Sequence, residues 1–436
     1  MRRYLLAALL VVIGYSSPVG RELTLGEALR LSTEHSHALK SATARTAAAE
    51  GAQRAALADR LPTMSVAAFG LYNSEVPTLD IELPPPVGVS FSREVGTDET
   101  YQADLRLSLP LFTGGLLGAN IDRARAWLTY TDALAQAERD QVLLQTRLAY
   151  LLLARADRVL DAACASLRRA EIIAADVGVL FDGGMADSVD ILEARLGLDQ
   201  AHFREQSAAI GRRSAEIMLL TLTGLPATEQ LEITGFPEAI PGELMPSTVL
   251  PGKPELKVAE AGVELSLSGM KAARAGYYPT LSAYAGYSYG RPNLDRFRDT
   301  WNDYFNFGAN LVWSFNAGNK VGAGVRAAEH EYGAACSERE RTAEVLDREA
   351  KLSLQNLKLA RKRYETARRH LRVTSDSYRL ATVRHREGVL SANRLLEIEA
   401  SLTEAESLLA GSLVDFFVAR SVHYFAIGSD KLREGF

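Results

Sequence analysis

Apolar residues recur at helical spacing over two very long stretches of the chain, residues 115–181 and 318–385. In the second stretch the spacing alternates between three and four residues, which is typical of the seam of a left-handed coiled coil. The residues on this seam are Leu357, Ala360, Tyr364, Ala367, Leu371, Thr374, Tyr378 and Ala381. A helix of roughly 65 residues would be about 100 Å long, whereas helices of globular proteins average only about 11–12 residues. The pattern therefore predicts two rods, because no compact core has that length.

Each rod ends at a turn that contains glycine, and a shorter helical stretch follows it. After the first turn, Asp187 or Ser188 can cap the next helix. Large apolar residues then recur at every seventh position of this stretch, at Val189, Leu196, Phe203, Ile210 and Ile217. An alanine-rich helix is also expected at the start of the chain, from about residue 25 to residue 60, because Thr24 and Glu27 form a capping-box pattern.

The segments that precede the two rods alternate at every second residue, which predicts β-strands. One strand ends before Pro110, and another covers residues 305–315. We expect one face of these strands to meet lipid, since alternation over about ten residues with aromatic side chains near the ends is typical of a transmembrane β-strand. The residues assigned to this face are Tyr101, Leu105, Leu107, Leu109, Phe305, Phe307, Leu311, Trp313 and Phe315. A half-buried sheet of a soluble protein is the alternative interpretation.

The two halves of the chain repeat the same order of elements. Pro62-Thr63 matches Pro279-Thr280 with an offset of 217 residues, and Gly115 matches Gly318 with an offset of 203. The difference indicates a deletion in the loop between the two strands of the second half. We therefore predict an internal duplication of helix, two strands and a long helical hairpin. The expected parts are a signal peptide at 1–20, a first repeat at 21–224, a linker at 225–253, a second repeat at 254–428 and a tail at 429–436.

The N-terminal residues have the pattern of a cleaved Sec-type signal peptide. Arg2 and Arg3 precede an apolar run that ends near residue 15, and small residues follow it. No cysteine lies nearby, so we expect no lipid anchor there. The formal net charge of −5 favours no nucleic-acid partner. The cysteines and histidines form no ligand pattern, and we expect no metal, no cofactor and no enzymatic activity.

Four strands per chain cannot close a barrel, and open strand edges do not persist in lipid. A trimer would supply twelve strands, enough for a channel. The sequence therefore predicts a homotrimer with a shared transmembrane β-barrel and a long α-helical barrel. The loops at residues 73–100 and 291–303 are expected to face the outside of the cell.

The chain resembles the TolC-like outer membrane efflux protein family from residue 23 to about residue 428. The motifs that carry the resemblance are Leu25-x-Glu27-Ala28-Leu29, Leu61-Pro62-x-Met64, Tyr278-Pro279-x-Leu281, Pro110-Leu111-Phe112-x-Gly114-Gly115, Trp313-Ser314-Phe315-x-x-Gly318, Gly184-x-x-Asp187-Ser188-Val189-Asp190-Ile191-Leu192 and Gly388-x-x-Ser391-x-x-x-Leu395-Leu396. The resemblance implies a homotrimeric channel in the bacterial outer membrane with a helical barrel in the periplasm. It also implies two partners, a periplasmic adaptor (membrane fusion) protein and an inner-membrane transporter.

The turns of the two helical hairpins are the predicted site for adaptor docking and for the gate. The residues assigned to this site are Gly183, Gly184, Met185, Ala186, Asp187, Asp190, Gly388, Val389, Leu390, Ser391 and Arg394. Two features depart from the family. His37-Ala38 stands where the family usually has Asn-Pro, and Asp190 has Arg394 at its counterpart, so the two turns differ chemically.

Two functions fit this architecture, and a third belongs to another class. The first is a passive exit duct of an efflux pump, and the second is the outer membrane duct of a type I protein exporter. The third is a periplasmic coiled-coil scaffold without a pore, which would have no use for the apolar strand faces.

Overall fold

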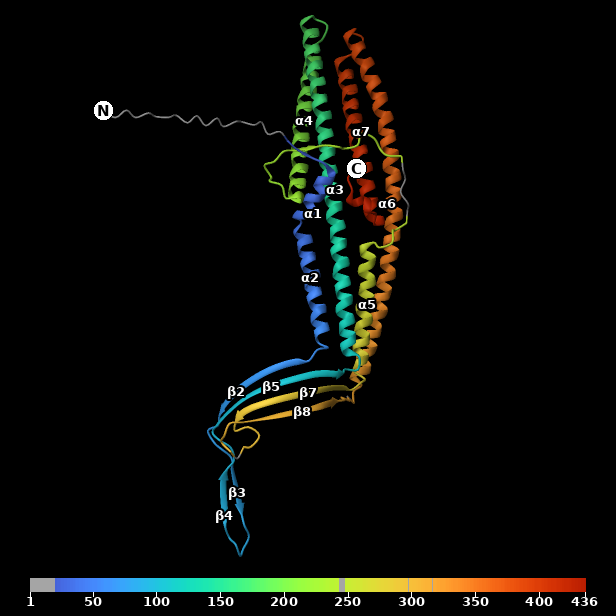
Figure 1. Cartoon of the computed structure of the whole chain (residues 1–436). Coiled ribbons are helices and arrows are strands. Elements are labelled where there is room, and N and C mark those ends of the chain that lie inside the picture. The colour runs from blue at the N-terminus through green and yellow to red at the C-terminus, as the bar shows by residue number, and fades with distance from the viewer. Residues whose placement is uncertain (1–19, 243–247, 297, 316) are drawn as a thin grey trace, which may run out of the picture. The chain divides into compact units, whose positions relative to one another are not determined.

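The computed structural model describes residues 20–242, 248–296, 298–315 and 317–436. The predicted signal peptide therefore lies, apart from Gly20, outside the described residues. The chain is mostly helical (Figure 1). It divides into two compact units, each built from separate segments. Of the described residues, the first unit contains those within 20–41, 135–254 and 343–436, and the second contains those within 42–134 and 255–342.

Three helices contribute several residues to each unit: α2 (His37–Ala58), α3 (Leu116–Asp182) and α6 (Lys320–Arg386). The first unit also holds β1 (Arg21–Leu23), α1 (Leu25–His35), α4 (Ser188–Thr223), β6 (Leu231–Ile233), α7 (Ala392–Ile427) and the 3-10 helix η1 (Asp430–Arg433). The second unit also holds β2 (Thr63–Tyr72), β3 (Thr78–Glu82), β4 (Ser90–Glu94), β5 (Glu99–Phe112), α5 (Pro254–Ala275), β7 (Thr280–Arg291) and β8 (Asn302–Val312). The long helices α3 and α6 have 67 residues each, and α4 and α7 have 36 each.

Both predicted rods are confirmed, and so is the predicted seam of the second rod. Leu357, Ala360, Tyr364, Ala367 and Ala381 are buried, and the other three seam residues are half-buried. The single helix expected near the start of the chain is wrong, because α1 ends at His35 and α2 begins at His37. Ser36 leaves the helical conformation, and its hydroxyl accepts a hydrogen bond from the Leu39 N–H at 3.3 Å. This bond is the ordinary capping role of serine at a helix start.

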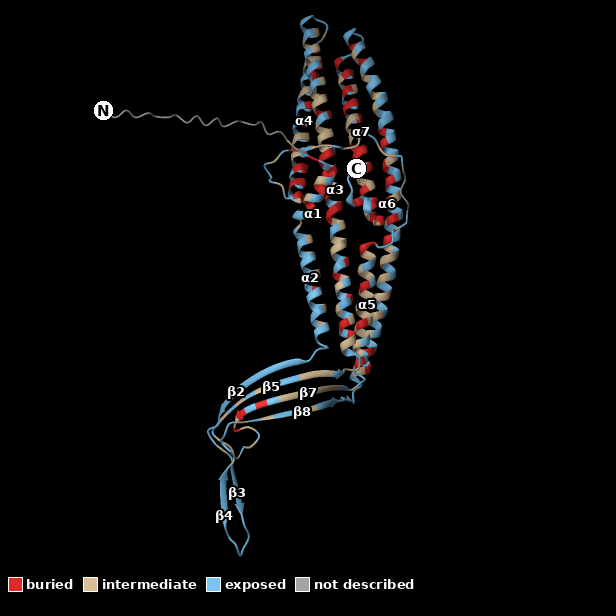
Figure 2. Ribbon diagram, viewed as in Figure 1, coloured by how far each residue is buried: buried red, intermediate tan, exposed pale blue. Residues whose placement is uncertain are grey.

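One buried cluster of the first unit lies where α1, α3 and α4 meet the parallel pair of β1 and β6 (Figure 2). Tyr150 of α3 is fully buried, and its hydroxyl donates to the carbonyl oxygens of Leu23 at 3.3 Å and Thr234 at 2.9 Å. Leu23 and Leu231 are buried beside it. A buried phenol needs such partners, because an unpaired polar group costs about 1–3 kcal/mol. Tyr150 therefore fixes the position of the β1–β6 pair on the long helix.

Glu216 is a buried acid that attaches the end of α4 to β6. Its Oε1 accepts the Leu231 N–H at 2.7 Å, and Arg212 and Arg213 form ion pairs with it at 3.4 and 2.5 Å. Burial alone would raise the pKa of Glu216, but the Leu231 hydrogen bond and the two arginines hold this pKa below its usual range. The carboxylate therefore stays charged at neutral pH, and its stabilising effect is lost as the pH falls through the lowered pKa.

The second unit contains a four-stranded antiparallel sheet in the order β2-β5-β7-β8. Within the described residues β2 and β8 are edge strands, each paired on one side only. The register places Val66, Leu105, Tyr287 and Phe305 opposite one another across the four strands. Paired residues share one face of a sheet. The apolar faces predicted for β5 and β8 are therefore the same face of one sheet.

Two details of this region differ from the expectations. The segment 73–100, expected as a loop, contains the antiparallel hairpin of β3 and β4. Trp313 and Phe315, assigned to the last strand, follow the end of β8 at Val312. Their rings pack at 4.7 Å, and the Trp313 indole donates to the Tyr277 carbonyl at 3.3 Å. Among the described helices, none is long and apolar enough to cross a membrane.

Candidate functional site

The two turns that join the long helices to their shorter partners have the same backbone geometry. Gly184 and Gly388 have φ values of 72° and 73°, in the left-handed region. Met185 and Val389, which follow these glycines, donate their N–H groups to the carbonyl oxygens five residues earlier, at 2.8 and 2.9 Å. This arrangement is the Schellman motif, which closes a helix through a left-handed residue. The predicted turn glycines therefore have a conformational reason to be glycine.

The caps that follow the turns differ between the two hairpins. Asp187 caps α4, and its carboxylate accepts the N–H groups of Val189 at 2.7 Å and Asp190 at 3.0 Å. Asp190 completes a capping box, because its Oδ2 accepts the Asp187 N–H at 3.0 Å. Ser391 caps α7 alone, and Arg394 forms an ion pair with Glu397 at 2.6 Å instead. The chemical difference predicted between Asp190 and Arg394 therefore has a structural consequence.

The predicted turn residues divide into exposed and half-buried ones. Met185 and Val389 occupy equivalent places and are each 74% exposed. Ala186 and Leu390 are half-buried, and Leu390 packs against a cluster that includes Ile173 of α3. The turn geometry explains the glycines, but it does not require an exposed apolar side chain at Met185 or Val389.

Replacement of Gly184 or Gly388 by alanine should lower stability by about 1–2 kcal/mol at each position, because a Cβ is disfavoured in the left-handed region. Steric contact adds nothing, since a Cβ at either site would have no atom within 4 Å. Gly183→Ala is the matched control, because Gly183 is not in the left-handed region. Thermal unfolding followed by helical circular dichroism measures the effect. Equal losses at Gly183 and Gly184 would contradict this account.

A cluster of polar side chains joins α3 of the first hairpin to α7 of the second. The Arg169 guanidinium contacts Glu399 at 3.1 Å, Glu406 at 2.9 Å and the Thr403 hydroxyl at 2.9 Å. Glu399 is almost fully buried and also accepts from Ser166 at 3.0 Å. Burial alone would lower the pKa of Arg169, but its hydrogen bonds to Glu406 and Glu399 raise this pKa above the ordinary value. The two hairpins are therefore joined by a charged, hydrogen-bonded cluster.

Arg169→Ala should destabilise the first unit by about 3–5 kcal/mol, because it leaves the Glu399 carboxylate buried without its cation. The double variant Arg169→Leu/Glu399→Leu should recover most of this loss, since it removes both charges. Arg168→Ala, at the neighbouring position of α3, is the control. The measurement is the midpoint of thermal unfolding of the parent protein and of each variant. A double variant no more stable than Arg169→Ala would show that the charge of Glu399 is not the cause.

Two stripes of exposed apolar residues follow the helices of the first unit. On α4 the stripe consists of the heptad residues predicted from the sequence, Val189, Leu196, Phe203, Ile210 and Ile217, and their exposed fractions range from 45% to 72%. Three of the five alanines of α4, Ala194, Ala201 and Ala215, are buried instead. On α6 a second stripe follows the same seven-residue interval with exposed Leu352, Leu359, Val373 and Leu380, and Thr366 interrupts it. This stripe was not predicted from the sequence, although its spacing could have identified it.

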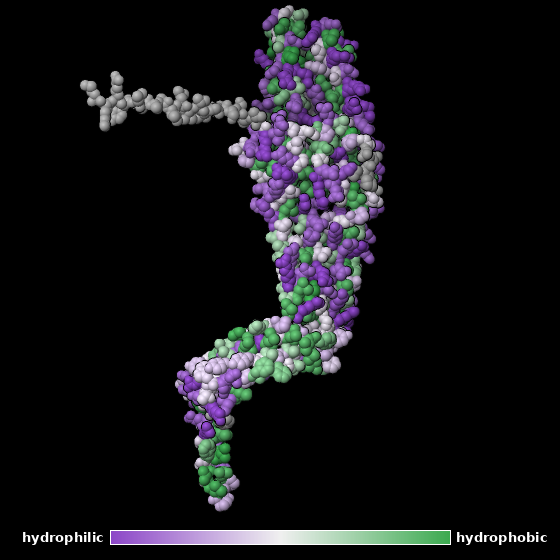
Figure 3. All heavy atoms as spheres, viewed as in Figure 1, coloured by the Kyte–Doolittle hydropathy of each residue, from purple (hydrophilic) through white to green (hydrophobic). Residues whose placement is uncertain are grey.

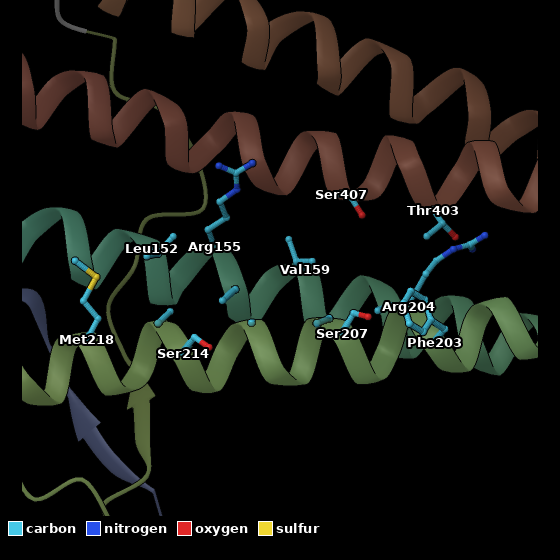
Figure 4. A pocket seen from close by; sticks show the side chains of 15 residues that line it. Leu152, Arg155, Val159, Phe203, Arg204, Ser207, Ser214, Met218, Thr403 and Ser407 are labelled. Carbon is cyan, nitrogen blue, oxygen red and sulfur yellow. The ribbon is translucent and has the colours of Figure 1, made fainter.

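An apolar groove of about 700 Å³ lies between α3, α4 and α7. Leu152, Arg155 and Val159 of α3, Phe203 and Met218 of α4, and Thr403 and Ser407 of α7 are among its lining residues (Figure 4). Phe203 belongs both to the groove and to the α4 stripe, so the two form one continuous apolar surface. We call the α4 and α6 stripes together the heptad stripes.

The two faces of the four-stranded sheet differ in chemistry. One face carries exposed Met64, Val66, Leu105, Phe305 and Phe307. The other face is mainly polar: Gln102 donates to Asp104 at 2.8 Å and to Ser288 at 3.1 Å, and the Arg106 guanidinium lies 5.2 Å from the centre of the Tyr284 ring. Figure 3 shows the apolar residues gathered over the strands. Of the residues assigned to lipid contact, those within β5 and β8 thus lie on one apolar face.

The described residues contain no group of three or more His, Cys, Asp or Glu side chains placed to hold a metal ion. A model of the outer membrane efflux protein family matches residues 28–225 and 245–412. The probable efflux pump outer membrane protein TtgC of Pseudomonas putida is 24% identical over 253 residues, which cover 56% of this chain and 51% of TtgC. The chain thus spans about half the length of the curated relatives it matches.

Solved structures resemble the chain over nearly its whole length. The outer-membrane channel OprN has a TM-score of 0.78 at 19% identity, with 94% of this chain and 91% of OprN covered. The outer membrane protein VceC of Vibrio cholerae has a TM-score of 0.76 at 17% identity, with 93% and 96% covered. At these identities the likeness establishes the fold alone.

Proposed function

We propose, because the chain belongs to the outer membrane efflux protein family, that three copies of it form a passive exit duct. Family membership places the chain in the bacterial outer membrane. The observation that carries the proposal is the sheet of β2, β5, β7 and β8, which has one apolar face, one mainly polar face and two open edges. Such a sheet is stable in lipid only if its edges are paired.

Three copies would pair the β8 edge of each chain with the β2 edge of the next and so close a barrel of twelve strands. The twelve residues of β7, at about 3.4 Å per residue and a tilt of about 45°, rise about 29 Å, close to the height of the apolar band of an outer membrane barrel. Aromatic clusters support the same placement. Trp301 stacks on Tyr101 and Tyr289 at one end of the strands, and Trp313 packs on Phe315 at the other.

The heptad stripes are the second support for self-association. A stripe that repeats every seven residues needs a helical partner with the same repeat. We propose that the α4 stripe of one copy packs on the α6 stripe of the next, so that the long helices form the wall of a periplasmic tube. The equal lengths of α3 and α6, and of α4 and α7, support the proposed internal duplication. The linker and C-terminal tail then lie outside the two repeats.

The proposed partners are a periplasmic adaptor and an inner-membrane transporter, with docking and gating at the two hairpin turns. Exposed Met185 and Val389 support this assignment, because apolar side chains at the end of a periplasmic rod have no intramolecular use there. The loops at residues 73–100 and 291–303 then face the cell exterior. A type I protein-export duct of the same architecture is the second candidate. The apolar face of the sheet argues against a scaffold without a pore.

Planar-bilayer recording tests the proposed duct with a pair of adjacent residues. The purified protein should form ohmic channels. Phe307→Arg should abolish them, because an arginine on the lipid face costs about 2–4 kcal/mol for each chain near the midplane. Asn306→Arg, on the opposite face of β8, should still conduct and shift selectivity toward anions. Loss of channels in both variants, or in neither, would contradict the assignment of the two faces.

A further inference from the structure

The β3–β4 hairpin has two chemically distinct faces. Its register pairs Ile81 with Phe91 and Leu79 with Arg93, and the Leu83 N–H donates to the Val89 carbonyl at 3.1 Å. Because paired residues share a face, one face carries Leu79, Ile81, Leu83, Val89 and Phe91, each between 45% and 54% exposed. The opposite face carries Thr78, Asp80, Glu82, Ser90, Ser92 and Glu94. Figure 3 shows apolar residues gathered along this hairpin.

A hairpin of this kind needs an apolar partner. An isolated two-stranded hairpin is at best marginally stable in water, and stability requires that an apolar face be covered. In the described chain the five apolar side chains remain half exposed. Arg93 is a charged residue on the apolar face. It lies at the end of the hairpin away from the turn, where its long side chain can reach solvent.

Charge argues against a lipid surface as that partner. Residues 73–100 carry six acidic side chains and one basic side chain. The outer surface of a bacterium is rich in anionic headgroups, which repel such a segment. A second copy of the hairpin avoids this repulsion if the apolar faces meet and the acidic faces point to solvent.

The proposed barrel brings the required copies together. Twelve strands about 4.8 Å apart and tilted by about 40° give a barrel radius of about 12 Å, so three equivalent points on its rim lie about 20 Å apart. A strand of five residues is about 17 Å long, which is enough to reach the axis. Tethering to one rim also raises the effective concentration of the hairpins to the millimolar range.

We propose that the β3–β4 hairpins of three copies pack their apolar faces against one another over the barrel axis and close the external mouth of the duct. This inference rests on the proposed trimeric barrel. The hairpin thus acts as an exit closure that is separate from the periplasmic turns.

Disulfide crosslinking of the full-length protein in detergent tests the contact, with Cys164 and Cys336 replaced by serine. Under mild oxidation Ile81→Cys should link pairs of chains several-fold more than Asp80→Cys, its neighbour on the acidic face. Equal yields in a preparation with the mass of three chains would overturn the hairpin proposal alone. A preparation without that mass would overturn both proposals. Quenching of a bimane label at Ile81→Cys by brominated phospholipid in vesicles would identify lipid as the partner and overturn contact between copies.

Conductance tests the closure itself. Ile81→Glu/Phe91→Glu places two charges on the apolar face of each hairpin and should increase the fraction of time that a channel spends open in a planar bilayer. Ser90→Glu/Ser92→Glu adds the same charges to the acidic face and should leave this fraction unchanged. Equal open fractions in the two double variants would overturn the closure.

Discussion

A glutamate at Phe203 of α4 or at Val373 of α6 should prevent three chains from assembling. Both side chains are large exposed parts of the heptad stripes, at 72% and 67% exposure, so neither substitution disturbs the core of the single chain. In the trimer each would bury an unpaired carboxylate in an apolar seam, at about 3 kcal/mol for each seam and roughly 9 kcal/mol for a ring of three. The variants should therefore remain helical and fail to form trimers.

The matched control for this prediction is Gln206→Glu, which adds the same charge to α4 at an exposed position outside the stripe. Native mass spectrometry from detergent should show three chains for the control and fewer for Phe203→Glu and Val373→Glu. If both stripe variants assemble like the control, the heptad stripes are not the surface between copies.

A glutamate at Met185 or Val389 should abolish export or open a leak while the trimer still assembles. Both side chains are 74% exposed and follow the left-handed glycines, so the turn geometry does not depend on them. Ala186 and Leu390 are less suitable positions, because both are half-buried. A carboxylate in place of either apolar side chain would have to be desolvated against any partner that contacts the turn, which costs free energy unless the partner supplies a hydrogen bond or a cation.

Export by cells that produce each turn variant is the measurement, with trimer yield determined in parallel. Gln206→Glu again controls for an added charge far from the turns. Unchanged export by trimers of Met185→Glu and of Val389→Glu would mean that the turns only connect helices and that the adaptor docks elsewhere.

The parts of the fold that repeat were predictable from the sequence. Heptad spacing identifies α6, because one face of a rod must be apolar over its whole length. The absence of proline and the near absence of glycine after Gly118 identify α3. Alternation of apolar and polar residues identifies the apolar face of β5 and β8, because successive side chains of a strand point to opposite faces of the sheet. The glycines of the two turns could be identified because only a left-handed residue closes a Schellman motif without strain.

The parts that depend on single contacts could not be predicted. The break at Ser36 depends on one side-chain hydrogen bond to Leu39 inside a sequence that favours helix on both sides. The polar cluster of Arg169, Glu399 and Glu406 joins residues more than 200 positions apart, and no local pattern records such pairs. The β3–β4 hairpin alternates over only five residues per strand beside three consecutive prolines, which favoured a loop. Trp313 and Phe315 continue the alternation of β8 past its last paired residue.

The central claim is that three chains share one barrel, and the mass of the full-length protein extracted in detergent tests it most directly. Light scattering with correction for bound detergent should give the mass of three chains, with the β8 edge of each chain paired to the β2 edge of the next. A folded monomer or dimer with its strands intact would contradict the barrel, the tube and the proposed duct together.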